Sequence, residues 1–155
     1  MSGFIINLAT LAVGTSRLEA RATAEDLELP PADWPEGVEA TLGLDRTGDL
    51  VSVRGSLRSS ARIECVRCLR TYALPLTVDL VVVADRAKGR GRLEEEIEAD
   101  DYMKFHDGRQ LDLREQARES LLLELPITPH CREDCRGLCP RCGADLNEGP
   151  CGCPA

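Results

Sequence analysis

The chain has 155 residues, of which 43% are hydrophobic and only 3% aromatic, and its formal net charge is −8. This length suits one domain with at most a small appendage, and the core must be built from Leu, Val and Ile. An acidic chain is a poor candidate for broad, non-specific nucleic-acid binding, but a local basic surface is compatible with it. No apolar run of about eighteen residues occurs, so we expect no membrane span.

The N-terminal stretch 4–13 is apolar but lacks the basic residues that open a signal peptide. We therefore expect a strand over about 4–11 and a cytoplasmic protein with reduced thiols. A second strand is expected within 15–29, followed by a proline-rich break at 30–35. Trp34, the single tryptophan, is expected to cover an edge of the core; stacking on a nucleic-acid base is the alternative.

The middle of the chain shows the period-two alternation of half-buried strands. Along 51–63 the odd positions are mostly apolar, whereas the even positions carry Arg54, Arg58 and Arg62 among serines. Residues four apart on a strand lie roughly 13 Å apart, so three guanidinium groups are expected to line one face of the sheet. The strands predicted from this alternation cover residues 38–45, 51–63 and 76–84.

This arginine stripe continues into Arg67 and Arg70 beside a Cys-x-x-Cys turn. Two interpretations are open. The five arginines can contact the phosphates of RNA, because a guanidinium group binds two phosphate oxygens at once. Alternatively, they form a solvated strand face that is paired with neighbouring acids.

Residues 85–101 carry a basic block followed by an acidic run. Their glycines and their charge predict a mobile loop, in which the two blocks neutralise each other. After this loop we expect a short strand at about 102–105 and a turn at 106–109.

One helix is expected over about 112–125. Asp112, with Glu115 three residues later, forms a capping-box start, and Pro126 ends the helix. Apolar residues recur at helical spacing, so one side of the helix is expected to pack on the sheet.

Six of the eight cysteines fall within residues 131–153. The turn Cys139-Pro-Arg-Cys142-Gly143 has the spacing of a zinc knuckle, in which two thiolates reach one ion. Its glycine allows the positive φ with which the chain leaves such a turn.

Three arrangements of the thiols are open. The first places one zinc ion on Cys139, Cys142, Cys151 and Cys153. The second adds another zinc ion on Cys65, Cys68, Cys131 and Cys135. The third is a set of disulfides, which the even count also allows; the spacing and a reducing compartment favour metal.

Side chains for catalysis are scarce. The only histidines are His106 and His130, both in expected turns, and neither a serine triad nor a phosphate-cradling glycine loop occurs. Thiol redox chemistry at Cys65 and Cys68 is an alternative, but the flanking sequence lacks the strand–motif–helix pattern of a thioredoxin-like site. We therefore expect no enzyme and no small-molecule substrate.

Three stretches carry a resemblance to a known family. They are Glu64-Cys65-Val-Arg67-Cys68-Leu69, the helix end Leu125-Pro126-Ile127, and the tail motif from Gly137 to Asn147. In this order the chain resembles the large ribosomal RNA subunit accumulation family, the YceD-like proteins, over nearly its whole length. The resemblance implies a role in the accumulation or processing of 23S ribosomal RNA, with ribosomal RNA or a large-subunit ribosomal protein as partner.

The predicted fold is α+β, mainly an antiparallel β meander with one packing helix and a C-terminal Cys-rich zinc knuckle. Residues 1–129 are expected to form the β domain, and residues 130–155 a zinc-binding segment packed on it. The expected function is a non-catalytic factor for 23S ribosomal RNA and large-subunit assembly, in which zinc is structural. A zinc-stabilised protein-binding adaptor without RNA contact is the alternative, and an exposed edge strand would make self-association easy.

Overall fold

The computed structural model describes residues 3–86 and 103–153. Its fold is α+β, as predicted, and is dominated by one largely antiparallel sheet. In chain order the elements are β1 (Ile5–Asn7), β2 (Gly14–Ala22), η1 (Glu25–Leu27), β3 (Val38–Thr47), β4 (Leu50–Glu64), β5 (Thr71–Arg86), β6 (Met103–His106), β7 (Gln110–Asp112) and α2 (Arg114–Glu124). The predicted mobile loop at 85–101 lies almost wholly outside the described residues.

The main sheet has the strand order β2-β3-β4-β5-β6. β2 to β5 form the predicted meander of antiparallel neighbours. The meander does not continue to β6, which runs parallel to β5 with Val83 opposite Met103. A parallel neighbour requires a connection of a dozen or more residues, and residues 87–102 provide that length.

β1 belongs to a second, two-stranded sheet with β7. It is shorter than the predicted strand at 4–11 because the chain turns directly after it. The side chain of Asn7 accepts a hydrogen bond from the backbone N–H of Ala9 at 2.9 Å, and the backbone N–H of Thr10 bonds to the Asn7 carbonyl.

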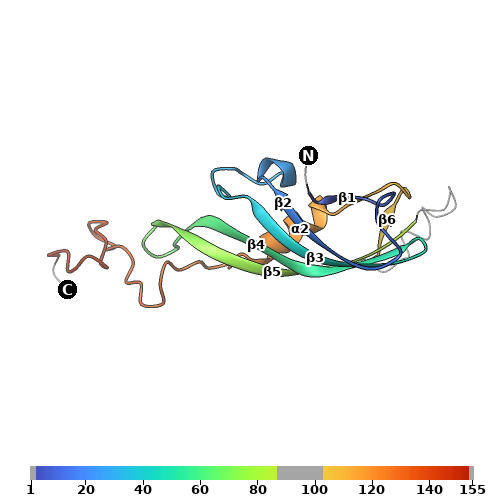
Figure 1. Ribbon diagram of the computed structural model, residues 1–155. Coiled ribbons are helices and arrows are strands. Elements are labelled where there is room, and N and C mark those ends of the chain that lie inside the picture. The colour runs from blue at the N-terminus through green and yellow to red at the C-terminus, as the bar shows by residue number, and fades with distance from the viewer. Residues whose placement is uncertain (1–2, 87–102, 154–155) are drawn as a thin grey trace, which may run out of the picture.

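The core lies on the face of the main sheet that η1, β1 and α2 cover (Figure 1). In β4 the predicted alternation holds, since Val51, Val53, Leu57 and Ala61 are buried while the arginines between them are exposed. Trp34 is only 3% exposed and belongs to the same core. Its ring therefore covers the core as expected and presents no face for stacking.

β4 and β5 extend beyond the rest of the sheet. β3 pairs only with the first part of β4, whereas β4 and β5 remain paired as far as Glu64 and Thr71. Residues 60–64 and 71–75 thus form a two-stranded arm, and β5 starts earlier than its apolar pattern predicted. Figure 1 shows the C-terminal segment lying beyond the tip of this arm.

The predicted capping box at the start of α2 is wrong. Asp112 is the last residue of β7, where it pairs with Ile5, so the helix begins after Leu113 and has no side-chain cap. The Asp112 carboxylate instead accepts the backbone N–H of Arg114 at 3.0 Å and its guanidinium at 2.7 Å. This Arg114 guanidinium also holds the pKa of Asp112 below its usual value.

His106 was expected in a turn, but this expectation is wrong. His106 is the last residue of β6 and is 5% exposed. Its Nδ1 accepts the backbone N–H of Gly108 at 3.0 Å, so its Nε2–H donates to the carbonyl of Asp49 at 2.7 Å. The imidazole therefore fastens β6 to the turn between β3 and β4.

Candidate metal centres

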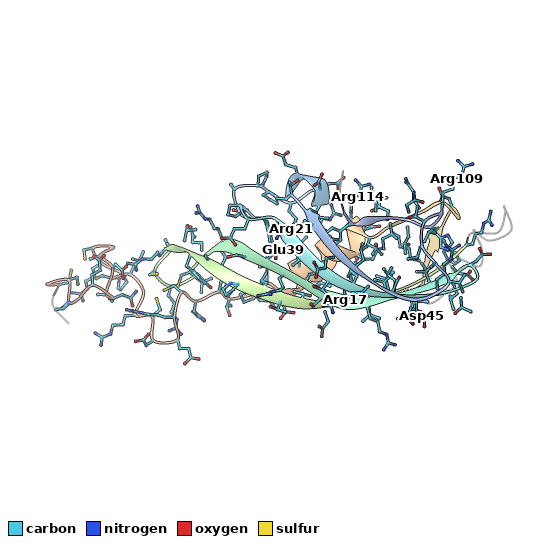
Figure 2. All side chains as sticks on the ribbon, viewed as in Figure 1. Arg17, Arg21, Glu39, Asp45, Arg109 and Arg114 are labelled. Carbon is cyan, nitrogen blue, oxygen red and sulfur yellow. The ribbon has the colours of Figure 1, made fainter. Side chains whose placement is uncertain are left out.

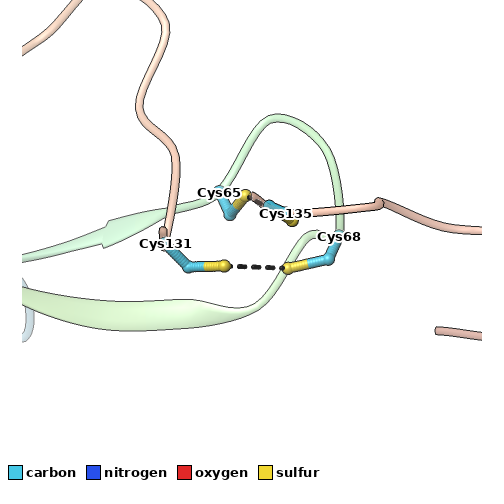
Figure 3. Close-up of side chains that lie close together, drawn as sticks. All are labelled: Cys65, Cys68, Cys131 and Cys135. Carbon is cyan, nitrogen blue, oxygen red and sulfur yellow. Dashed lines mark hydrogen bonds between the residues drawn. The ribbon is translucent and has the colours of Figure 1, made fainter. Parts of the chain in front are cut away.

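The hairpin–tail cluster joins cysteines that are far apart in the sequence. Its members are Cys65, Cys68, Cys131 and Cys135, and their sulfurs all lie within 4.8 Å of one another. The Sγ atoms of Cys65 and Cys135 are 3.7 Å apart, and those of Cys68 and Cys131 are 3.6 Å apart. Figure 3 shows two sulfurs from the hairpin facing two from the tail.

Backbone contacts bring the tail to the arm. After α2 the chain is extended, and the carbonyl of Pro129 accepts the backbone N–H of Val66 at 2.9 Å. The Arg67 guanidinium donates to the carbonyl of Cys135 at 3.0 Å. Gly137, at φ 76°, passes so close to Arg67 that a Cβ there would lie 3.2 Å from its carbonyl oxygen. The cluster is therefore part of a larger docking contact.

The tail cluster is local. It consists of Cys139, Cys142, Cys151 and Cys153, whose sulfurs also lie within 4.8 Å of one another. Cys139 is buried, Cys142 is exposed, and the other two are half-buried. The cluster thus lies within one short stretch of chain and opens to solvent on the Cys142 side.

Both Cys-x-x-Cys turns have the same backbone geometry. The residue after the second cysteine donates its N–H to the carbonyl of the first, from Leu69 to Cys65 at 3.0 Å and from Gly143 to Cys139 at 2.9 Å. Both donors have positive φ, 60° at Leu69 and 75° at Gly143. Leucine adopts this conformation at a cost that glycine avoids.

In each turn, backbone N–H groups stabilise the thiolate of the first cysteine. Burial opposes the ionisation of Cys65, but the backbone N–H groups of Cys68, Cys131 and Arg67 outweigh it and lower the pKa of Cys65 to about 6. In the tail cluster, backbone N–H groups from the corresponding places of the turn lower the pKa of Cys139 to about 6. A metal ligand must be deprotonated, so this geometry suits metal binding.

One thiol in each cluster resists ionisation when no cation is present. Burial, together with the neighbouring thiols, raises the pKa of Cys131 to about 12. Neighbouring thiols raise the pKa of Cys153 to about 11. Since four thiolates repel one another at this spacing, each cluster needs a cation to be fully ionised. The donor set fits a metal ion.

The eight cysteines all lie among the described residues and are free thiols. The structure therefore does not contain the disulfides that were considered from the sequence. Of the three open arrangements, the one with two four-cysteine groups matches the geometry. His130, the neighbour of Cys131, is exposed and belongs to neither group.

The structure divides the predicted arginine stripe. Arg54, Arg58 and Arg62 are exposed on β4. Arg67 is engaged by the tail, as described above, and Arg70 binds the Asp145 carboxylate at 3.0 Å. These two arginines therefore help to position the cysteine-rich segment.

One arginine of the same sheet face was missed in the sequence. Arg17 is exposed on β2, and the pairing places it opposite Gly43, which in turn lies opposite Arg54. The alternation of 15–22 indicated which side of β2 faces solvent, but only the register shows that Arg17 and Arg54 share a rung.

Residues 53–155 match the family described as large ribosomal RNA subunit accumulation protein YceD, and this stretch holds both clusters. The chain belongs to the YceD family. Within the part of the chain that the structure describes, no helix is both long and apolar enough to cross a membrane. No solved structure matches the chain.

Two plant proteins among the curated relatives carry the YCED name. An uncharacterized protein of Mycobacterium tuberculosis is 32% identical over 127 residues, which cover 80% of this chain and 58% of that protein. The large ribosomal RNA subunit accumulation protein YCED homolog 1, chloroplastic, of Arabidopsis thaliana is 26% identical over 173 residues, covering 96% of this chain and 54% of the plant protein. Its Zea mays namesake is 28% identical, covering 83% and 55%. The chain thus spans little more than half the length of these relatives.

Proposed function

We propose that this protein is a non-catalytic factor for the accumulation of 23S ribosomal RNA and the assembly of the large ribosomal subunit, acting in the cytoplasm. The observation that carries the proposal is the match to the YceD family, whose plant members bear the name of this role. The two-stranded arm and the tail docked on it form an extended surface, which suits contact with a large partner. Ribosomal RNA or a large-subunit ribosomal protein is the proposed partner.

Each cluster holds one structural zinc ion in this proposal. A tetrahedral zinc with Zn–S bonds of about 2.3 Å separates its sulfurs by about 3.8 Å. The two shortest separations in the hairpin–tail cluster, 3.7 and 3.6 Å, agree with that spacing. Four cysteine ligands leave no open position for water, so neither ion would perform chemistry. The ion of the hairpin–tail cluster would hold the segment 130–155 on the domain 1–129.

Contact with RNA is proposed for the arginines of the arm and sheet. Arg54, Arg58 and Arg62 would contact RNA directly, because their guanidinium groups are exposed. Arg67 and Arg70 would contribute mainly by fixing the tail, since both guanidiniums already bind tail oxygens.

The experiment that tests the function is removal of the gene from the organism that encodes it, followed by measurement of the 23S to 16S ribosomal RNA ratio. We expect the ratio and the yield of large subunits to fall, and the intact chain to restore both. An unchanged ratio would overturn the proposal. The zinc content is tested separately, with two ions and eight protected thiols per chain as the expected result.

A protein-binding adaptor without RNA contact is the second candidate. Apolar side chains at the end of α2 and just after it favour it, since Leu123 is 85% exposed and Ile127 is 98% exposed. Such an adaptor would keep its partner after nuclease treatment, whereas an RNA-dependent complex would dissociate. The thiol redox function is disfavoured. The pKa of Cys65 is lowered to about 6, but its sulfur is buried against the tail, out of reach of a protein disulfide.

A further inference from the structure

The solvent-facing side of β4 has a regular chemical pattern. At every second position from 52 to 62 it reads Ser-Arg-Ser-Arg-Ser-Arg. β4 lies between β3 and β5 in the main sheet, so this pattern runs along the middle of the face opposite the core. We call this face, formed by the outward residues of β2, β3 and β4, the outer face.

Four arginines of the outer face are free to bind a ligand. Among the described arginines, four on this face make no side-chain hydrogen bond or ion pair: Arg17, Arg54, Arg58 and Arg62. Several guanidiniums elsewhere are engaged, as Arg118 is by Glu28 at 2.8 Å and Arg114 is by Asp112. An anion reaching the outer face would therefore not have to displace an internal partner.

Acids on the outer face limit how it can bind. Glu39 of β3 lies opposite Arg58 of β4 in the register. Its carboxylate binds Arg21 of the other neighbouring strand, β2, at 2.5 Å (Figure 2). Glu19 and Asp45 are outward as well, and Asp79 of β5 lies next to the face, opposite Ser56, so the surface is not uniformly basic. Binding must use spaced guanidiniums rather than a broad positive field.

The spacing of the guanidiniums is fixed by the sheet. Along β4 they recur every roughly 13 Å, and Arg17 lies two strands, about 10 Å, from Arg54. Gly43 lies between these two without a side chain. The result is an open hollow of about 770 Å³, and its lining includes the hydroxyl groups of Thr41 and Ser56 and the carboxylate of Asp79.

Aromatic rings are missing from the outer face as far as it is described. Phe4 and Trp34 are buried in the core, and Tyr72 packs against the hairpin–tail cluster. Phe105 lies in the groove beside α2. Proteins that recognise single-stranded RNA rely on stacking bases on such rings, whereas proteins that bind double helices contact phosphates and 2′-hydroxyls.

We propose that the outer face binds a base-paired RNA helix. This inference rests on the proposed function and names the RNA class that its arginines recognise. Arg17, Arg54 and Arg58 bind phosphates on the rigid sheet, with Arg62 extending the contact toward the arm. The serine hydroxyls between them donate to phosphates and 2′-hydroxyls, which supplies a preference for RNA over DNA.

The test is fluorescence anisotropy with the zinc-loaded 155-residue chain. The probes are an RNA duplex of about 20 base pairs, each of its strands alone, and the DNA duplex of the same sequence. We expect the RNA duplex to bind at least tenfold more tightly than either strand and than DNA. With about four phosphate contacts, affinity should fall roughly a hundredfold between 50 and 200 mM salt.

Variants connect this binding to the outer face. Arg58→Ser should weaken duplex binding about tenfold and reduce the salt slope by about one, and Arg17→Ser should act similarly. Arg109→Ser is the matched control. Arg109 is also exposed and without a side-chain partner among the described residues, but Figure 2 places it on the opposite side of the sheet from Arg17. Unchanged zinc content would show that each variant is folded.

The possible results separate this inference from the function on which it rests. Tighter binding of single strands, or duplex binding that Arg58→Ser and Arg17→Ser leave unchanged, would overturn the outer face as a duplex site and leave RNA contact in place. Binding of no RNA at all, with a large-subunit protein retained after nuclease treatment, would overturn RNA contact as a whole.

Discussion

Each of the two cysteine clusters contains a Cys-x-x-Cys turn of the same geometry, but different parts of the chain support the two clusters. In the hairpin–tail cluster, one Cys-x-x-Cys turn ends a two-stranded arm, and its partners come from 63 and 70 residues away. In the tail cluster, the same turn finds its partners within residues 139–153. The first cluster is built on the paired ends of β4 and β5, whereas the second is supported by a few backbone bonds, such as Leu146 N–H to the Gly137 carbonyl at 2.9 Å.

This difference would give the two proposed ions different roles. A metal in the hairpin–tail cluster fixes a tertiary contact, because it closes a long loop and acts together with the Val66–Pro129 and Arg67–Cys135 bonds. A metal in the tail cluster creates local structure in a segment too short to form a core of its own. Loss of the first ion should therefore change the shape of the whole molecule, and loss of the second only the last residues.

Removing one ligand from each cluster gives the largest expected contrast. Structural zinc contributes roughly 10 kcal/mol or more to the folding of a small site, so Cys65→Ser should release the hairpin–tail ion and free the tail. Limited proteolysis should then cut between 126 and 138 much faster than in the parent protein. Cys151→Ser should also lose one ion per chain but keep the tail protected as far as Cys135. Equal protection in both variants would contradict the division of roles.

The rate of metal loss should distinguish the same two clusters in the unmodified protein. Cys142 is exposed, whereas Cys65, Cys68 and Cys135 are buried, so a chelator reaches the tail cluster first. We expect two phases of zinc release to a chromogenic chelator, at least tenfold apart in rate. Cys151→Ser should abolish the fast phase. A single phase carrying two ions would show that the clusters open together.

Arg67→Ala tests the docking contact without touching a ligand. The hydrogen bond from its guanidinium to the Cys135 carbonyl contributes about 1 kcal/mol. Its loss should speed the slow phase of zinc release about fivefold and leave the fast phase unchanged. Arg136→Ala is the control, because Arg136 is exposed and its side chain makes no bond among residues 3–86 and 103–153.

The smallest contrast concerns the residue that leaves each turn. Leu69 has a φ of 60°, which costs a residue with a side chain about 1–2 kcal/mol. Glycine at this position would avoid that cost. Glycine also loses more conformational freedom on folding, which offsets about 0.5–1 kcal/mol of the gain in stability. Leu69→Gly should therefore raise the melting temperature slightly, and Gly143→Ala should lower it. The measurement is thermal unfolding of the zinc-loaded protein. A lower melting temperature for Leu69→Gly would mean that the exposed Leu69 side chain stabilises the arm.

The local parts of the fold were predictable because their causes are local. Period-two alternation predicted β3 and β4, Pro126 predicted the end of α2, and the spacing of Cys139 and Cys142 predicted the Cys-x-x-Cys turn. The start of α2 was mispredicted because pairing of β7 with β1 holds Asp112 in a strand, which a helical pattern cannot reveal.

By itself the sequence determined the family, the antiparallel meander and the presence of enough thiols for two ions. It left open whether Cys65 and Cys68 lie near Cys131 and Cys135, and only the tertiary structure brings these four sulfurs together. The physical reason is that the grouping of these cysteines depends on two tertiary features. β4 and β5 extend beyond the end of β3, and the extended chain after α2 returns to the tip of these two strands. For the same reason the register alone placed Arg17 beside Arg54, and the docked tail alone supplied the oxygens that the exposed Arg67 and Arg70 bind.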